Sequence, residues 1–543
     1  MTTHEQSLRD HVPGTIHLVE LEASEHDSKG HIVLHPQPSA DPEDPLNWSR
    51  KRKLWNIGMV YAYILGVGIP TTVQYSILTN ISEETGISLA DLNTGTGLMF
   101  LFAGWGCLFW QPIALTYGRR GVYVISSLLC IPPMVWTAYT TSTGAWYAHR
   151  ILIGFFVAPV ESLPEVSVPD LFFAHERGNY MGLYCLFLFG SNALAPLLAG
   201  FIANSLGWRA AIWFGTIVAA VGTLVIFFGM EETIYFRSAI EGVNGAVETT
   251  QTEAVGEKNE SKVAGEPVMS ESSSPAASDI VRSPPKTYWQ KLTLFRLLPQ
   301  RPSNKQMFIM MVRPLMIFFF FPNVDWAGFL YGASLCLYQV GNGTVAFILG
   351  GAPYHFSSSM VGLSYTAGLI GSLLGWVYAG WIADKVTLYL ARRNNGVREP
   401  EQRLWVLVPS GIIAAAGLIL WGVGAAHRVH WMGLMFGLAM FQFGIVVGAT
   451  TSLAYNVDCF KEIAGETLIL VIVIRNTMGY GMAYGITPWI NASGVQNTFI
   501  GTAFLFIGCT CSFLIMTVWG KRFRKMCAKK YWHFVDTLIV ASH

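Results

Sequence analysis

Four ionisable residues lie inside long apolar stretches of the sequence, where a charge is costly unless it has a partner or faces a water-filled space. They are the acids Glu161, Glu165 and Asp325 and the base Arg475. Glu161 and Glu165 are four residues apart and would share one face of a helix. An acid in such a place can bind and release protons, so we predict that Glu161, then Asp325, then Glu165 are the candidates for proton coupling.

Two of these residues also have plainer interpretations. Asp325 follows Pro322 closely, and an acid in that position can cap a helix that starts near the proline. Arg475 has the chemistry to bind a carboxylate of a ligand, but an ion pair or a backbone contact within the protein explains a buried arginine more simply. The sequence leaves both alternatives open.

Aromatic and amide side chains in other apolar stretches are candidates for the lining of a binding cavity. Aromatic rings with a few hydrogen-bonding groups suit an amphiphilic organic molecule, and a nearby acid suits a cation. The residues nominated for substrate binding are Gln74, Tyr75, Asn192, Tyr331, Tyr338 and Gln442. For any one of them, ordinary packing inside a membrane is the alternative interpretation.

Motifs of several other function classes are missing from the sequence. We find no paired histidines at metal-ligand spacing, no Walker loop and no nucleophile elbow, so neither an enzyme nor an ATP-driven pump is predicted. The N-terminal histidines are irregularly spaced in a polar, Pro-rich stretch, which favours disorder over metal binding. We expect no metal, no cofactor and no catalytic residue, and an ion gradient as the source of energy.

Transmembrane helices are the elements predicted to position these residues. Of the 543 residues, 52% are hydrophobic and only 13% are charged, which is typical of a membrane protein. The net charge of +1 gives no reason to expect nucleic acid as a partner. About twelve apolar runs are long enough to cross a bilayer. The sequence therefore predicts an all-α membrane protein, which we expect to work as a monomer in the lipid bilayer.

The seventh apolar region is too long for a single crossing. It covers residues 306–350, whereas about 20 helical residues are enough to cross the hydrocarbon core. We expect its first part, from Met307 to Phe319, to be partly interfacial, with Pro314 and Pro322 as breaks in the helix.

Polar segments divide the chain into two groups of six spans. We expect a disordered tail over residues 1–53, a largely disordered linker over 233–305, where Ser, Glu, Ala and Pro are frequent, and a polar tail over 521–543. The six-helix bundles are then residues 54–232 and 306–520. A protein built from two such halves is expected to bind its ligand at their interface, near the middle of the membrane.

The distribution of basic residues predicts which side of the membrane each loop faces. Lysines and arginines precede the first span and follow the second, fourth, eighth and twelfth, whereas the loops at 80–93 and 350–359 contain none. Both ends of the chain are therefore expected in the cytosol. Two N-glycosylation sequons, at Asn80 and Asn491, fall in loops that this topology places outside.

Two loops, one in each half, carry versions of the same short motif. Residues 117–120, Tyr-Gly-Arg-Arg, match the end of the loop motif Gly-x-x-x-Asp-Arg-x-Gly-Arg-Arg, although Leu115 and Gln111 stand where an Asp and a Gly are expected. Residues 380–385, Gly-Trp-Ile-Ala-Asp-Lys, match the same motif in the second half. With these motifs the chain resembles the major facilitator superfamily, and within it the fungal twelve-span drug:proton antiporters, which include polyamine and organic-cation carriers.

The resemblance implies a gate made by these loops. Their basic residues would pair with acids or helix ends of the facing half and release them as the halves move. The gate residues implied in this way are Gly118, Arg119, Arg120, Asp384 and Lys385. The alternative is that Arg119 and Arg120 only anchor the topology.

Further motifs resemble those of the same family. Residues 150–154 are similar to Arg-x-x-Gln-Gly, with Ile153 in place of the Gln, and residues 195–200 are similar to the antiporter motif Gly-Pro-x-x-Gly-Gly. The residues that carry these resemblances, with a pair in the eleventh span, are Arg150, Gly154, Pro196, Gly200, Arg475 and Asn476. The small residues around Pro196 would let its helix press on the opposite half.

The resemblance implies secondary active transport of a small organic or amphiphilic solute, such as a drug, toxin or secondary metabolite. Efflux by proton antiport with alternating access is the first hypothesis. Proton-coupled import of polyamines or organic cations is the alternative, and a sensor that uses a transporter fold without moving a solute is an alternative of another class. The expected location is the plasma membrane, with the vacuolar or peroxisomal membrane also open.

The predicted topology can be tested by labelling single cysteines in intact cells with a reagent that cannot cross the membrane. In a background without the native cysteines, Glu83→Cys and Ser357→Cys should be labelled. Cysteines at Ser272 in the linker, at Arg119 or at Lys385 should be labelled only after the cells are permeabilised. Labelling at Ser272→Cys without labelling at Glu83→Cys would show that the predicted orientation is the wrong way round.

Overall fold

The computed structural model describes residues 12–17, 41, 43–235, 290, 292–295 and 301–541. The remaining parts of the N-terminal tail and of the linker, for which disorder was expected, lie outside the described residues. The helices of the N-terminal half are η1 (Pro45–Asn47), α3 (Arg50–Thr72), η2 (Val73–Ser76), α4 (Leu78–Thr85), α5 (Leu89–Tyr117), α6 (Arg119–Ala138), α7 (Thr143–Val157), α8 (Pro159–Leu171), α9 (Ala174–Leu206) and α10 (Trp208–Gly229).

The C-terminal half begins after the linker. Its helices are α13 (Asn304–Ile317), α14 (Pro322–Gly350), α15 (Ser358–Val377), η3 (Tyr378–Ile382), α16 (Ala383–Arg393), η4 (Pro400–Val406), α17 (Leu407–Ala426), α18 (Trp431–Cys459), η5 (Lys461–Ile463), α19 (Ala464–Cys511) and α20 (Phe513–Ala541). The described residues contain two strands, β1 (Ile16–His17) and β2 (Val397–Arg398), which pair antiparallel.

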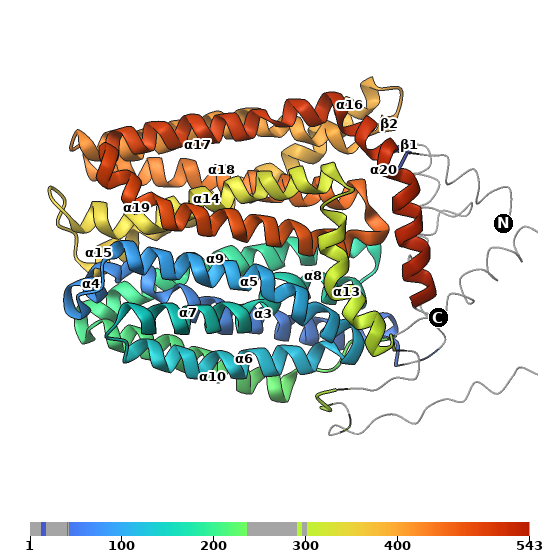
Figure 1. Ribbon diagram of the computed structural model, residues 1–543, viewed down its shortest axis with the longest axis horizontal. Coiled ribbons are helices and arrows are strands. Elements are labelled where there is room, and N and C mark those ends of the chain that lie inside the picture. Colours follow the sequence, from blue (N-terminus) through green and yellow to red (C-terminus); the bar gives the residue numbers. More distant parts are fainter. Residues whose placement is uncertain are drawn as a thin grey trace, which may run out of the picture.

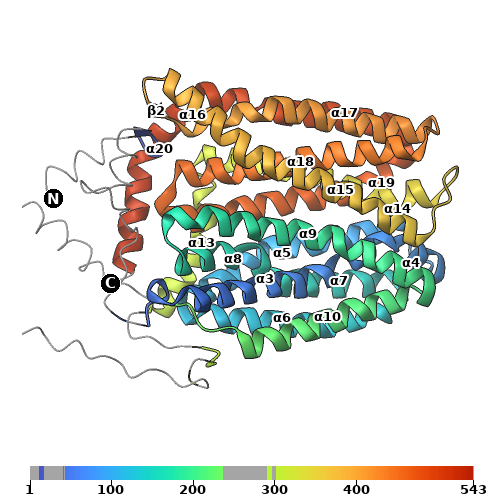
Figure 2. The same ribbon diagram turned by 180° about the vertical axis from the view of Figure 1, so that it is seen from behind.

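The long helices form two bundles that lie side by side with their axes roughly parallel (Figures 1 and 2). We call the end with β1, β2, α16 and the C-terminal part of α20 the termini side, and the end with α4 the opposite side. Among the described residues, eleven helical runs are long and apolar enough to cross a membrane. The protein is thus an all-α membrane protein, as predicted.

The last helical run accounts for two crossings. The 48 residues of α19 would make a helix of about 72 Å, more than twice the thickness of a bilayer core. The helix is interrupted at Gly494, which has φ 76° and ψ 162°, a conformation that glycine adopts without strain. The chain turns back there, so the described spans agree with about twelve crossings.

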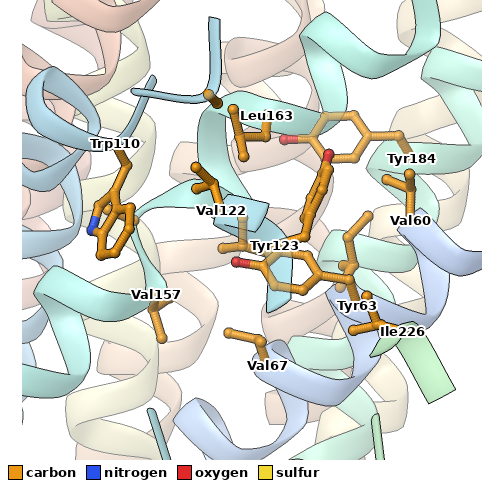
Figure 3. Packing of buried hydrophobic residues seen from close by; sticks show 14 of the residues in the cluster. Val60, Tyr63, Val67, Trp110, Val122, Tyr123, Val157, Leu163, Tyr184 and Ile226 are labelled. Carbon is orange, nitrogen blue, oxygen red and sulfur yellow. The ribbon is translucent and has the colours of Figure 1, made fainter. Parts of the chain in front are cut away.

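The core of the N-terminal bundle combines apolar packing with paired hydroxyl groups (Figure 3). Tyr63 of α3 and Tyr123 of α6 meet edge to face, with ring centroids 4.7 Å apart. The Tyr63 hydroxyl hydrogen-bonds with Ser126 at 2.9 Å, and the Tyr123 hydroxyl with Ser167 of α8 at 2.9 Å. These bonds satisfy polar groups that have no water available, and they fix how α3, α6 and α8 pack.

Two spans of the N-terminal bundle are broken in their interior. The first span changes from α3 to the 3₁₀ turn η2 at Val73, shortly after Pro70. The fourth span is divided into α7 and α8, and Pro159 begins α8. Pro164 lies inside α8, which continues through it. The break at Pro159 places Glu161 in the first turn of a helix, where an acid is favourable.

The seventh apolar region consists of two helices, as expected from its length. Pro322 is the first residue of α14, so the predicted break at this proline is found. Pro314 lies inside α13, and the expectation of a break there was wrong. The helix α13 runs across the termini side, transverse to the spans (Figure 1).

Residues 12–17 are held on the C-terminal bundle, so the expectation of a tail disordered over its whole length was wrong for this segment. Ile16 and His17 pair with Arg398 and Val397. The Arg524 guanidinium, which is completely buried, donates two hydrogen bonds to Glu401 and further ones to the Pro13 carbonyl and the Thr15 hydroxyl. The buried cation needs more acceptors than one carboxylate supplies, and the N-terminal segment provides them.

The two bundles touch closely where α9 meets α15. A side-chain carbon added at Gly200 would clash with the carbonyl oxygen of Ser358 and lie 3.1 Å from Gly362. On the same helix, a carbon added at Gly190 would meet nothing within 4 Å. The glycine of the antiporter-like motif thus permits the close approach of the two bundles.

Gly200→Val should weaken the packing of the two bundles, because overpacking at a backbone contact costs about 1–3 kcal/mol. The measurement is the thermal unfolding midpoint of the purified protein in detergent. Gly190→Val is the matched control on α9 and should leave the midpoint unchanged. Equal midpoints for the two variants would show that the contact at Gly200 does not hold the bundles together.

Candidate functional site

The candidate site is centred on an ion pair that joins the two bundles. Glu161 of α8 pairs with Arg475 of α19, and both side chains are largely buried, with 10% and 7% of their surface exposed. The residues come from the fourth and eleventh spans, so the pair crosses the interface between the halves. A buried pair stabilises a structure only when its remaining hydrogen-bonding groups are also satisfied.

Neighbouring side chains satisfy the groups of this pair. The Asn476 amide nitrogen donates to the Glu161 carboxylate at 2.7 Å, and Arg475 donates to the Asn476 amide oxygen at 2.9 and 3.1 Å. Arg475 also donates to the hydroxyl of Tyr331, on α14, at 2.8 Å and lies over its ring at 4.6 Å. Glu161, Arg475, Asn476 and Tyr331 form one connected network, which we call the interface network.

Close helix packing positions the interface network. A side-chain carbon added at Gly104, on α5, would lie 2.7 Å from the Asn476 side chain, so the glycine makes room for the asparagine. On α8, the break at Pro159 lets Glu161 start a new helical turn beside α19. Of the sequence-predicted residues, the structure brings together Glu161, Arg475, Asn476 and Tyr331.

Glu165 lies one turn beyond Glu161 on α8, as its spacing predicted. It is partly buried and makes no ion pair or hydrogen bond with any residue in the described part of the chain. Its electrostatic neighbours are Arg475 and Glu161, and it also lies near Tyr184 of α9. Glu165 is therefore an additional acid beside the interface network rather than a member of it.

Asp325 is separated from the interface network. It lies in the first turn of α14, near Cys527 of α20 on the termini side. Arg475 touches α14 at Tyr331, which is six residues, or about 9 Å, further along the helix. The helix dipole favours an acid in a first helical turn. The cap position of α14 is Phe321, and no side chain caps the helix, so the interpretation of Asp325 as a capping residue was wrong. Its Oδ1 atom is buried and has no hydrogen-bond partner in the described part of the chain.

A small cavity brings together three of the residues nominated for substrate binding. Asn192 of α9, Tyr338 of α14 and Gln442 of α18 line a space of about 30 Å³ between the two bundles. This volume holds a few water molecules at most. An organic solute would need the bundles to separate here, so the cavity is closed in this conformation.

Gln74 and Tyr75 reach the same region from the broken first span. The Tyr75 ring meets the Tyr338 ring edge to face, with centroids 6.2 Å apart. Both residues are buried, and within the described residues neither the Gln74 amide nor the Tyr75 hydroxyl has a hydrogen-bond partner. Buried polar groups without partners are rare in native proteins, and a cluster of them points to bound water or ligand.

Sequence reasoning missed three polar residues of this cavity, namely Asn342, Tyr365 and Ser372. Asn342 of α14 and Tyr365 of α15 line it, and within the described chain the Asn342 amide nitrogen and the Tyr365 hydroxyl have no hydrogen-bond partner. Asn342 lies four residues after Tyr338, a spacing that places both on one helix face and was available as a signal. Tyr365 offered no such signal, because only the packing of α15 against α14 brings it there.

Arg150 and Gly154 have packing roles that the structure makes visible. The Arg150 guanidinium is buried, lies over the Trp146 ring at 4.3 Å and donates to the Met99 sulfur. A side-chain carbon at Gly154 would clash with the Met99 carbonyl oxygen. This motif therefore holds α7 closely against α5.

The described contacts of Arg119 and Arg120 lie in the N-terminal half and the linker, whereas partners in the facing half were expected. Arg119 pairs with Asp170, at the end of α8, at 2.9 Å. Arg120 donates to the carbonyl groups of Phe227, Met230 and Leu292. These carbonyl groups supply acceptors for the completely buried guanidinium of Arg120.

Gly118 is explained by a carboxylate that sequence reasoning did not single out. Glu232 accepts hydrogen bonds from the backbone nitrogens of Arg119 and Arg120, both at 3.0 Å, and so caps the start of α6. Gly118 has φ 125°, and a side-chain carbon there would lie 2.5 Å from the same carboxylate. Burial raises the pKa of Glu232 above its usual value.

The second gate loop likewise pairs within its own half. Asp384 accepts from Arg403 at 2.7 Å, and Arg403 also lies near Asp458. The Lys385 ammonium lies over the Trp381 ring at 3.5 Å. In this conformation, Arg119, Asp384 and Lys385 therefore pair within their own halves.

The interface network predicts strong energetic coupling between its two charges. Glu161→Gln or Arg475→Gln alone leaves one buried charge without its partner, which costs about 3–5 kcal/mol. The double variant should lose clearly less than the sum of the two single losses, measured as thermal unfolding in detergent. Additive losses would mean that the two charges do not stabilise each other.

Comparison with known proteins agrees with this architecture. Residues 60–467 of this chain match the family described as the Major Facilitator Superfamily. An uncharacterized MFS-type transporter of Schizosaccharomyces pombe is 31% identical, over 97% of this chain and 95% of its own. Protein HOL1 of Saccharomyces cerevisiae is 27% identical, over 97% of each chain, and the MFS antiporter QDR3 of Candida albicans is 23% identical, over 91% of this chain and 81% of its own.

A solved structure shares the fold. The xylose transporter XylE from E. coli, in a partially occluded inward open conformation, superposes with a TM-score of 0.55 at 11% sequence identity, over 85% of this chain and 98% of its own. The arrangement of two bundles around an interface is common to both proteins. With a family match over most of its length, the chain belongs to the Major Facilitator Superfamily of transporters.

Proposed function

We propose that this transporter exports small organic or amphiphilic solutes in exchange for protons, and that Glu161 is its proton-binding group. The observation that carries the proposal is the ion pair between Glu161 of one bundle and Arg475 of the other. A relative that is named an antiporter, QDR3, supports exchange.

Protonation of Glu161 would change the contact between the bundles. The neutral carboxyl group loses the attraction to Arg475, and Tyr331 and Asn476 remain as partners of the guanidinium. The conformation with the pair intact is then less favoured, and the bundles can rearrange. Release of the proton on the other side of the membrane restores the pair. In this way, proton binding and bundle movement are linked through one side chain.

The solute would bind in the region of the closed cavity. Its lining combines aromatic rings from Tyr338, Tyr365 and Phe441 with amides from Asn192 and Gln442. Such a surface suits an amphiphilic molecule with a few polar groups. Because the lining comes from both bundles, opening the cavity requires the same movement that the interface network controls.

Proton-coupled import of organic cations is the second candidate. The observation that favours it is Glu165, an acid beside the interface network that has no ion-pair partner in the described chain. A free carboxylate near Tyr184 suits a cation through charge and through the aromatic ring. The charge of the transported solute distinguishes the two candidates.

We further propose that the termini side faces the cytosol and that the protein works in the plasma membrane. The basic residues support this orientation, because the start of α6, the end of α16 and the C-terminal part of α20, with their arginines and lysines, lie together on the termini side (Figures 1 and 2).

Transport in vesicles tests the proposed exchange. Vesicles with an acidic interior should accumulate at least one member of a panel of neutral and cationic fluorescent amphiphiles, in a manner that depends on the pH difference. Glu161→Gln should abolish this net accumulation, whereas exchange of solute without a pH difference should continue. Glu462→Gln changes an exposed acid in η5, just before α19, and is the matched control that should keep full accumulation.

The same experiment separates the alternatives. If Glu161→Gln and Asp325→Asn both retain full accumulation, neither acid couples protons to transport. Binding of the amphiphiles without any accumulation would instead favour a sensor that does not transport.

A further inference from the structure

The helix α13 has two distinct faces. Met307, Arg313 and Ile317 are buried against the bundles. The outward side chains are apolar, namely Phe308, Ile309, Val312 and Met316, each about half exposed or more. Their spacing follows one helix face, and the helix lies transverse to the spans at the termini side (Figures 1 and 2). An amphipathic helix in this orientation places its apolar face in the boundary region of the bilayer.

The C-terminal part of α20 also lies across the termini side and has a basic outer face. Arg524, Cys527 and Tyr531 are buried against the C-terminal bundle. The exposed positions on the other face are mostly basic, namely Arg522, Lys525, Lys529 and Lys530, with the exposed Met526 among them. No acid of the described chain forms an ion pair with any of these four side chains. A row of unpaired cations on one helix face attracts anions.

Direct contacts join the two helices. Arg313 of α13 donates to the Phe534 carbonyl of α20 and lies over the Phe534 ring at 4.7 Å. The Lys530 ammonium lies over the ring of Phe320, just beyond the end of α13, at 2.9 Å. The exposed apolar face of α13 and the basic face of α20 are therefore parts of one surface, which we call the α13–α20 platform.

We propose that the α13–α20 platform is a binding site for acidic phospholipids of the leaflet on the termini side. The four cations of α20 bind the phosphate and carboxylate of the headgroup, and the apolar face of α13 contacts the beginning of the acyl chains. A soluble acidic partner would use the cations but would leave the apolar face of α13 in water. A lipid satisfies both parts of the platform, and the cytosolic orientation proposed above places it at the leaflet that is rich in anionic lipids.

The platform is connected to both bundles. The Tyr117 hydroxyl, at the end of α5, donates to the Asn304 side chain of α13 at 3.1 Å. On the other side, Arg313 pairs with Glu466, at the start of α19, at 3.1 Å. The helices α5 and α19 also carry Gly104 and the Arg475–Asn476 part of the interface network. A lipid bound at the platform is thus placed where it stabilises one arrangement of the bundles over another.

Lipid binding to the purified full-length protein in neutral detergent tests the proposal. The probes are short-chain phosphatidylserine and phosphatidylcholine, with binding measured by native mass spectrometry and by the shift of the thermal unfolding midpoint. The wild-type protein should bind phosphatidylserine at least about tenfold more tightly, as expected for several cations near one headgroup. Added salt should reduce this preference.

Two sets of variants assign the preference to the platform. The combined change Arg522→Gln, Lys525→Gln, Lys529→Gln and Lys530→Gln should abolish it, and the smaller charge reversal Lys529→Glu with Lys530→Glu should do the same. The matched control replaces four exposed cations elsewhere on the termini side, Arg50, Lys51, Arg392 and Arg393, by Gln and should keep the preference.

Three results would overturn the proposal. They are a wild-type protein without preference for phosphatidylserine, an equal loss of preference in the control variant, and full preference in both platform variants. Glycerophosphoserine, the headgroup without acyl chains, should compete only weakly. Competition as strong as that of the intact lipid would show that a soluble anion is the ligand and would also overturn it.

Discussion

A charge inside an apolar bundle needs a partner, and in this protein the requirement is met across the boundary between the two halves. Glu161 and Arg475 are both largely buried, and each half contains only one of the two charges. Their pairing draws α8 to α19, and Asn476 and Tyr331 complete the hydrogen bonds. Because a proton can remove the charge of the carboxylate but not that of the guanidinium, the strength of this contact depends on protonation. The closed cavity lies between the same two bundles, so its opening depends on the same contact.

The sequence was sufficient to predict the class of fold and one member of the central ion pair, Glu161. Apolar runs with few charges predicted the spans, and the rarity of acids within them made Glu161 the first candidate. Arg475 and Asn476 were noticed, but their pairing with Glu161 was not predictable. The partners are more than 300 residues apart in the chain, and only the relative register of two bundles brings them together. Asp325 carried the same signal as Glu161, yet its place in the first turn of α14 follows from where that helix begins.

The loops illustrate a second limit of sequence analysis. Arg119 and Arg120 belong to a motif for which a partner in the facing half was expected, and their acceptors are instead Asp170 and nearby backbone carbonyls. Glu232 caps α6 just after the last span of its half, in a position that composition assigns to the edge of a polar linker. Residues 12–17 resembled a disordered tail, because their order depends on Arg524, more than 500 residues away. Partners of this kind are determined by tertiary packing and carry no local pattern.

The central claim is that the protonation state of Glu161 determines the arrangement of the two bundles. Distances between spin labels at Lys51→Cys and Lys461→Cys, exposed positions on the two bundles at the termini side, test it without any knowledge of the solute. In a background without the native cysteines and with Glu161 intact, acidification should shift the distance distribution, and Glu161→Gln should give the acidic distribution at every pH. A wild-type distribution that does not change with pH, or a Glu161→Gln variant that still responds to pH, would contradict the account.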